Sequence, residues 1–271
     1  MAPEPLIASA AGAREPETSG GIERTRAAAA GPLLLAVETA TRVMSVALLE
    51  GERLVAEITS DDARAHSERL LPAIDRLLAL ANVRLDDVTA FAVSIGPGSF
   101  TGLRIGLATV KAFAFDERRP VAGVPTLAAL CAAAVGASGP VAALLDARRG
   151  EVYAAVCAWA GEPHPSRLAD SVFTPRALAA VLPPDAALVI GEGAAAAAAE
   201  LLALRPDLRA LPPGEGAARA SRVGRLGQTL LAAGARVPAA ELVPRYVRRA
   251  EAEARRTGEP LEDTAPKLPP G

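Results

Sequence analysis

The glycine-rich segment Gly96–Arg104 contains the residue types best suited to binding chemistry in this chain. It follows an apolar run and leads into a nearly apolar helix expected from about Gly102 to Phe115. Thr101 is the expected N-cap of that helix, so the free N–H groups behind it could face an anion. The segment lacks the Gly-Lys-Ser/Thr of a Walker A loop. It is therefore compatible with two roles, an anion cradle that includes Gly98 and Ser99 or a purely structural turn.

Two further turns carry charged side chains that could line a cleft. Glu38 and Thr39 follow the first expected strand, and Glu38 is either a cleft carboxylate able to hold Mg²⁺-bound phosphate or a strand-end charge that faces solvent. Asp146 and Arg149 occupy the corresponding turn of the second half of the chain. Arginines stand there in place of the glycines that a phosphate-binding turn favours. Close approach of the backbone to a phosphate is not expected, although the cationic side chains could still reach an anion.

Metal sites and hydrolytic triads find little support in the residue spacing. The two histidines, His66 and His164, are far apart, and no H-x-x-x-H or C-x-x-C pair occurs. His66 begins an expected helix and could transfer a proton, but a surface or interface position is the simpler interpretation. Cys131 and Cys157 lie in apolar runs, which is typical of buried reduced thiols. No serine sits in a G-x-S-x-G elbow, so no catalytic serine nucleophile is expected. The histidine and cysteine spacing likewise predicts no metal site.

The first half of the chain alternates strands and helices in the order β-β-β-α-β-α-β-α. Hydrophobic periodicity and turn residues predict strands at 33–37, 43–49, 53–59, 89–95 and near 121, and helices at 67–81, 102–115 and 126–134. The turn at Glu50-Gly51-Glu52 predicts a hairpin, and Pro72 is expected to kink or delimit the first helix. Three antiparallel strands followed by alternating elements predict a mixed sheet with helices on both faces, an α/β fold.

The second half repeats this pattern less regularly. Strands are expected at 141–145, 151–159, 168–173 and 187–190, and helices from 174, at 194–204 and at 217–233. We therefore expect two fused copies of one unit that face each other across a cleft. The predicted division is a disordered N-terminal extension over 1–31, lobes over 32–135 and 136–237, and a C-terminal segment over 238–271 that is mostly disordered after 257.

The composition indicates an ordinary soluble protein. The chain has 271 residues, 51% of them hydrophobic, and a formal net charge of −2, which gives no general attraction to nucleic acid. No apolar run is long enough to cross a bilayer, and the first residues carry acids that a secretion signal avoids. With only two cysteines as well, the expected location is the cytoplasm, with no contact with a membrane.

Five stretches of the sequence resemble the TsaB family, a subunit of the bacterial machinery that makes threonylcarbamoyladenosine in tRNA. They are Ala36–Ala40, Ser45–Leu48, His66–Pro72, Gly96–Arg104 and Asp146–Tyr153. The resemblance extends over about Leu33 to Arg249, and the last two stretches are specific to that family. It implies an ASKHA fold (actin-like ATPase, ribonuclease H-like) of duplicated ββαβαβα lobes with mixed sheets flanked by helices.

The same resemblance implies that this chain does no bond chemistry itself. The catalytic relative TsaD holds a metal with two histidines, whose places here are taken by Thr126 and Leu130, neither of which binds iron or zinc as imidazole does. Family members usually carry Asp where this chain has Glu38, which weakens a nucleotide-site interpretation. Glu38, Thr39, Gly98, Ser99, Asp146 and Arg149 are then a vestigial nucleotide or anion site, and no cofactor is expected.

The resemblance further implies that the chain is a scaffold that binds TsaD and, through it, the ATPase TsaE. The three together would modify the adenosine next to the anticodon in ANN-decoding tRNAs, with tRNA contacted indirectly through the complex. The implied interface with TsaD, or with a second copy of this chain, comprises His66, Leu70, Leu71, Ile74, Leu78, Arg104 and Lys111. The apolar members could equally be plain core. The alternative activities are a Mg-ATP-dependent ASKHA phosphotransferase and, less favoured, an M22-type metallopeptidase.

Overall fold

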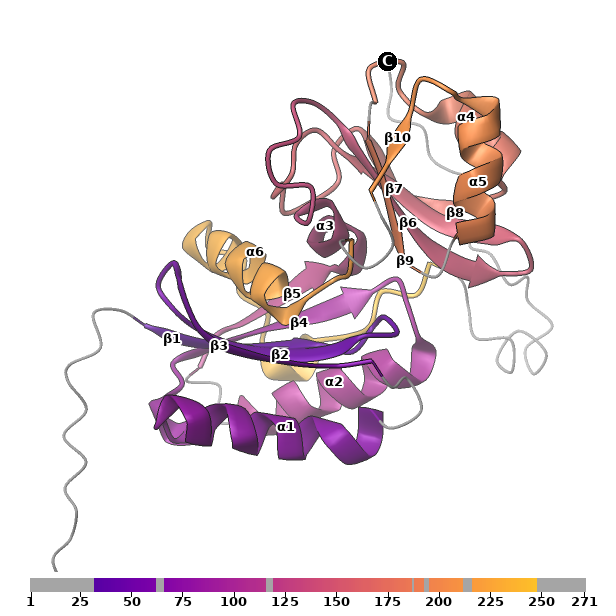
Figure 1. Ribbon diagram of the computed structural model, residues 1–271. Coiled ribbons are helices and arrows are strands. Elements are labelled where there is room, and N and C mark those ends of the chain that lie inside the picture. Colours follow the sequence, from indigo (N-terminus) through magenta and orange to yellow (C-terminus); the bar gives the residue numbers. More distant parts are fainter. Residues whose placement is uncertain are drawn as a thin grey trace, which may run out of the picture.

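The computed structural model describes residues 32–61, 66–115, 119–186, 188–192, 195–211 and 216–247. The predicted N-terminal extension and the tail after 257 lie outside these residues. In the described part, two five-stranded sheets form two lobes (Figure 1). No helix of the described residues is both long and apolar enough to cross a membrane.

The first lobe begins with the predicted antiparallel strands. Its strands are β1 (Leu33–Glu38), β2 (Met44–Glu50), β3 (Arg53–Ser60), β4 (Ala90–Gly96) and β5 (Val121–Pro125). They lie in the order β3-β2-β1-β4-β5, with β4 and β5 parallel to β1. Helices α1 (His66–Ala81) and α2 (Phe100–Phe113) cover one face of this sheet (Figure 1). Pro72 lies inside α1, which continues through it. A short 3₁₀ turn, η1 (Leu85–Asp87), joins α1 to β4.

The second lobe repeats the topology of the first. Its strands are β6 (Val141–Arg148), β7 (Glu151–Cys157), β8 (Leu168–Phe173), β9 (Leu188–Glu192) and β10 (Arg209–Ala210). Their order, β8-β7-β6-β9-β10, matches that of the first sheet strand for strand. Helices α4 (Pro175–Val181) and α5 (Ala195–Leu204) cover its outer face. The predicted α/β fold of two related lobes is confirmed.

The last helix of each repeat packs across the boundary between the lobes. Helix α6 (Ala220–Ala232) contacts β1, β2, β4 and β5 of the first sheet, and α3 (Thr126–Cys131) contacts β6 and β7 of the second (Figure 1). Two glycines let α6 lie close to the sheet, because a Cβ at Gly224 or Gly227 would stand 2.4 Å from a side-chain carbon of Leu49 or Ala92. Helix α6 thus covers the sheet of the first lobe, although its residues lie in the range 136–237 predicted for the second lobe.

One apolar core joins the two sheets through these helices. It includes Ala36 of β1, Leu127 of α3, Ala143 of β6 and Leu226 of α6. The remaining two apolar clusters lie beneath α1 and α2 and beneath α4 and α5. Because β1 and β4 are parallel neighbours, their carboxyl ends meet at one edge of the first sheet. The predicted turn after β1 and the predicted glycine loop therefore lie side by side.

Candidate functional site

The carboxylate of Glu38 is buried at the end of β1 and bonded within the fold. Its Oε1 accepts the N–H groups of Ala40 at 2.6 Å and Thr41 at 3.1 Å, and its Oε2 accepts the hydroxyl of Ser94 at the end of β4. The exposed fraction of Glu38 is 0%. The side chain therefore does not face solvent, and its oxygens already have partners from both strand ends.

The glycine loop is fastened to the same turn by backbone contacts. The hydroxyl of Thr39 donates to the carbonyl of Gly102 at 2.8 Å, and the N–H of Ser99 donates to the carbonyl of Ala40 at 2.7 Å. A Cβ at Gly98 or Gly102 would lie 2.3 Å or 2.0 Å from the carbonyl oxygens of Ala40 and Thr39. These glycines serve the close approach of two backbones. The contacts favour the structural turn over the anion cradle.

The N-cap of α2 differs from the predicted one. Ser99, two residues before the predicted Thr101, accepts the N–H of Gly102 at 3.2 Å with its hydroxyl, and the helix begins at Phe100. Thr101 lies in the first turn and is exposed. Because Ser99 is engaged at both its N–H and its hydroxyl, it contributes to holding the corner rigid.

A C-terminal strap, residues 242–247, crosses the glycine loop. The N–H of Arg245 donates to the carbonyl of Ile95 at 2.6 Å, and a Cβ at Gly96 would lie 2.5 Å from the carbonyl oxygen of Arg245. Gly96 has a φ of +115°, a conformation that side chains rarely adopt. The ring of Tyr246 stacks on that of Phe100 with centroids 5.0 Å apart. The strap therefore covers the start of α2 from outside.

The strap also reaches the second lobe. The guanidinium of Arg245 pairs with the carboxylate of Asp170 in β8 at 2.5 Å. The Asp170 side chain is only 2% exposed, and this burial raises its pKa, while the positive charge of Arg245 acts against the rise. Sequence patterns had not singled out Asp170 or Phe100, because their partners lie far away in the chain.

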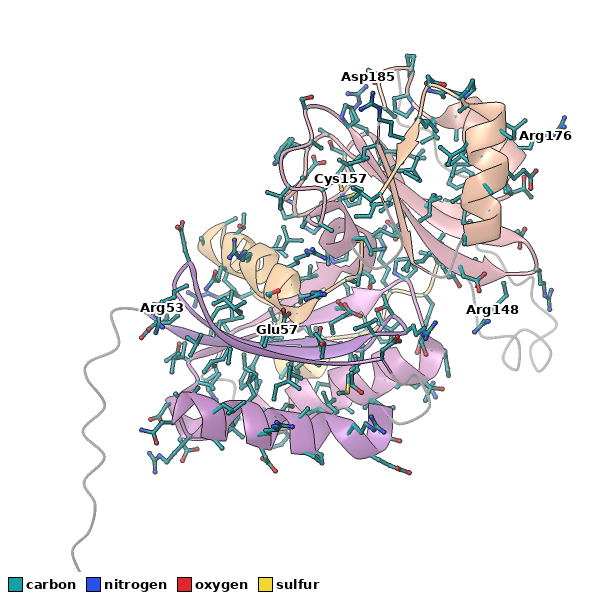
Figure 2. All side chains as sticks on the ribbon, in the orientation of Figure 1. Arg53, Glu57, Arg148, Cys157, Arg176 and Asp185 are labelled. Atoms are coloured by element: carbon teal, nitrogen blue, oxygen red, sulfur yellow. The ribbon has the colours of Figure 1, made fainter. Side chains whose placement is uncertain are left out.

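The predicted second-lobe turn is an exposed hairpin. Arg148 and Arg149 both have positive φ, 69° and 57°. The carboxylate of Asp146 accepts the N–H of Arg148 at 2.8 Å and lies 3.6 Å from its guanidinium. Figure 2 shows Arg148 at the end of the second lobe, away from its core. Asp146 thus orders its own turn, whereas Glu38 and Thr39 are bonded within the first lobe.

The predicted partner face divides into core and surface. Leu70, Ile74 and Leu78 are buried beneath the first sheet, in agreement with the core alternative. Leu71 is 51% exposed, and Arg104 is exposed with its guanidinium 4.1 Å from the centroid of the Phe100 ring.

The remaining predicted members of that face are Lys111 and His66. Lys111 is half-buried, and its ammonium donates to the carbonyl of Ala240 in η2 (Ala239–Glu241) at 3.3 Å. His66 begins α1, but its side chain lies outside the described residues. Two exposed apolar side chains on the same layer were not predicted, Leu80 at the end of α1 and Phe115 after α2.

Helix α3 carries Thr126 and Leu130, which stand where TsaD has its two metal-binding histidines, and both residues are buried, at 0% exposure. Across the described residues, no group of three or more His, Cys, Asp or Glu side chains stands close enough to hold a metal ion. Cys131 in α3 and Cys157 in β7 are free buried thiols, and a hydrogen bond with Cys131 together with burial raises the pKa of Cys157. Such thiols are unreactive.

Known proteins resemble both the sequence and the fold. A family model described as "TsaD: tRNA N6-adenosine threonylcarbamoyltransferase" matches residues 53–203. The tRNA threonylcarbamoyladenosine biosynthesis protein TsaB of Haemophilus influenzae is 42% identical over 123 residues, which are 44% of this chain and 51% of that protein. The chain spans about half the length of the curated relatives it matches.

Two solved structures from Pseudomonas aeruginosa match over their full length. An uncharacterised protein with similarity to the peptidase YeaZ is 34% identical with a TM-score of 0.70, and the match covers 80% of this chain and 100% of that one. YeaZ itself is 32% identical with a TM-score of 0.67, over 79% of this chain and 99% of that one. The chain belongs to the TsaB family. The predicted resemblance is confirmed, and the fold is the ASKHA fold expected of TsaB.

Proposed function

We propose that this chain is a non-catalytic subunit that pairs with TsaD and, with TsaE, supports transfer of the threonylcarbamoyl group to the adenosine next to the anticodon in ANN-decoding tRNAs. The observation that carries the proposal is the closed state of the vestigial site. Hydrogen bonds join the turn after β1 to the glycine loop, from the hydroxyl of Thr39 and the N–H of Ser99, and the carboxylate of Glu38 accepts N–H groups of that turn. The C-terminal strap covers the corner where the turn and the loop meet. A nucleotide phosphate would have to displace these internal bonds.

The proposed docking face for TsaD is the outer layer formed by α1 and α2. Leu71, Leu80 and Phe115 expose apolar side chains there, with exposed fractions of 51%, 65% and 83%. Exposed apolar groups and exposed arginines, such as Arg104 of α2, are typical of a protein interface. In the absence of TsaD, the same face would pair two copies of this chain.

Reconstitution of tRNA modification tests the proposed role. The chain alone is expected to show no transferase, phosphotransferase or peptidase turnover and to restore modification when TsaD and TsaE are added. Calorimetry of the isolated chain with Mg-ATP is expected to show weak or no binding. Turnover by the isolated chain that is lost in Glu38→Gln would overturn the proposal.

Co-purification with TsaD tests the docking face. Leu71→Glu is expected to weaken pairing while leaving the fold intact, because the side chain is half exposed. The matched control is Leu204→Glu on α5 of the second lobe, whose side chain is 40% exposed. Equal loss of pairing in both variants, or in neither, would remove α1 from the interface.

A further inference from the structure

A groove of about 520 Å³ lies between the lobes, on the face of the first sheet that α6 covers. Its walls come from β3, the loop after α3, the loop after β7, and α6 itself. In Figure 1 these segments meet around α6, on the opposite side of the first sheet from α1 and α2. The residues that define this inter-lobe groove are Leu54, Val135, Trp159, Arg222, Arg225 and Leu226.

Positive charge gathers along the α6 side of the inter-lobe groove. Arg222 and Arg225 of α6 line the groove one turn apart, and Arg219, the N-cap residue of the helix, precedes them outside the lining. In the described part of the chain, no carboxylate lies within 4.0 Å of any of their side-chain nitrogens. The carboxylate of Glu57 accepts the N–H of Ser221 at 2.8 Å, and its negative charge also acts on Arg222. The guanidinium of Arg222 donates one N–H to the carbonyl of Ala217. Two arginines and no acidic side chain therefore line the groove, and the nearby Glu57 offsets only part of their positive charge.

The opposite wall of the inter-lobe groove presents an aromatic plane. Trp159, the one tryptophan of the sequence, is 55% exposed although it lines the groove. The polar side chains of the lining are mainly donors: two guanidiniums and the indole N–H. The two hydroxyls are those of Ser221 and Thr229, and the latter already donates to the carbonyl of Arg225. A matching ligand brings acceptors, negative charge and a flat ring.

We propose that the inter-lobe groove binds an unpaired nucleotide of an RNA strand, with the base stacked on Trp159 and a neighbouring phosphate held by Arg222 and Arg225. Exposed bases stack on aromatic side chains, and guanidinium groups bind phosphate through paired N–H donors. A peptide also supplies acceptors through its carbonyl groups, but an unpaired base brings a flat ring to Trp159 beside the negative charge of its phosphate. The inference rests on the proposed function, since RNA is the substrate of that complex, and it places RNA away from the α1–α2 face.

Binding of single-stranded RNA to the full chain alone tests this site. Titration with a short oligoadenylate is expected to quench tryptophan fluorescence, and that signal reports only on the inter-lobe groove because Trp159 is unique. With an end-labelled oligonucleotide, Trp159→Ala is expected to weaken binding about five- to 150-fold, and Trp159→Phe to recover most of it. Arg225→Ala is expected to weaken binding similarly, whereas the exposed Arg176→Ala on α4 serves as the unchanged control (Figure 2).

The salt dependence gives a second readout. Neutralisation of one phosphate on a single strand predicts a slope of about −0.7 for log affinity against log salt, and the slope should be shallower in Arg225→Ala. The proposal is overturned if the oligonucleotide does not bind, or if Trp159→Ala and Arg225→Ala bind it as tightly as the unaltered chain. It is also overturned if adenosine monophosphate binds as tightly as the oligonucleotide, or if an acidic peptide of equal charge quenches as strongly. These assays omit TsaD and TsaE, so their failure is separate from a failure of reconstitution.

Discussion

Replacement of Glu38 by alanine should destabilise the protein strongly, because the carboxylate joins two strand ends. The variant leaves the N–H groups of Ala40 and Thr41 and the hydroxyl of Ser94 without their acceptor, in a place with no access to water. Each buried polar group that loses its partner costs about 1–3 kcal/mol. The free energy of unfolding should therefore fall by about 3–9 kcal/mol, with a further contribution from the cavity.

Urea unfolding followed by circular dichroism measures this loss, and two controls separate its causes. Glu38→Gln keeps a carbonyl oxygen for the two N–H groups and turns its amide toward the hydroxyl of Ser94, so it should lose less than about 1.5 kcal/mol. Glu200→Ala, on the exposed side of α5, should stay within about 0.5 kcal/mol of the unaltered protein. An unchanged unfolding midpoint in Glu38→Ala would refute the view that this carboxylate is structural.

Three further expectations concern the same corner and the core. Gly102→Ala should destabilise the fold by several kcal/mol and lower the melting temperature, because its Cβ would meet the carbonyl of Thr39 at 2.0 Å. Gly136→Ala should cost less, because nothing lies within 4 Å and only the strain of a φ of +86° remains, about 1–2 kcal/mol. Burial raises the pKa of Asp170 above 3.8, so the folded state holds the proton of this carboxyl group more tightly than the unfolded state does. The contribution of this group to the free energy of unfolding therefore falls as pH rises through the raised pKa. Asp170→Asn should flatten that part of the curve of stability against pH, and an unchanged curve would contradict the assignment. Cys131 and Cys157 should react with a thiol reagent only at the rate at which the protein opens, and fast labelling of the native chain would contradict their burial.

The fold was largely predictable because its signals are local. The apolar run of β1, the hairpin at Gly51 and the helix caps at Thr174 all follow from neighbouring residues. The two-residue β10 carries too short a pattern to detect. Ser99 and Thr101 are both good caps, and the choice between them depends on Ala40, whose carbonyl fixes the N–H of Ser99.

The candidate site was less predictable because its partners are distant in the chain. The sequence places Glu38 at a strand end, but its bond to Ser94 spans 56 residues and exists only once β1 and β4 are paired. The adjacent leucines of α1 suggested a stripe wide enough for both core and interface, and only the packed helix separates Leu70 from Leu71. Nothing in the residues next to Arg245 indicates its partner Asp170, which lies in the second lobe.

The crossing of α6 onto the first sheet constrains how the chain matures during synthesis. The strands of the first lobe leave the ribosome early, yet Ala36 and Ala92 remain uncovered on one side until residues 220–232 have been made. One face of the first sheet thus stays exposed while about a hundred further residues are synthesised, and exposed apolar surface promotes aggregation during this period. A chain truncated before residue 220 therefore has all five strands of the first sheet but lacks the helix that covers one of its faces.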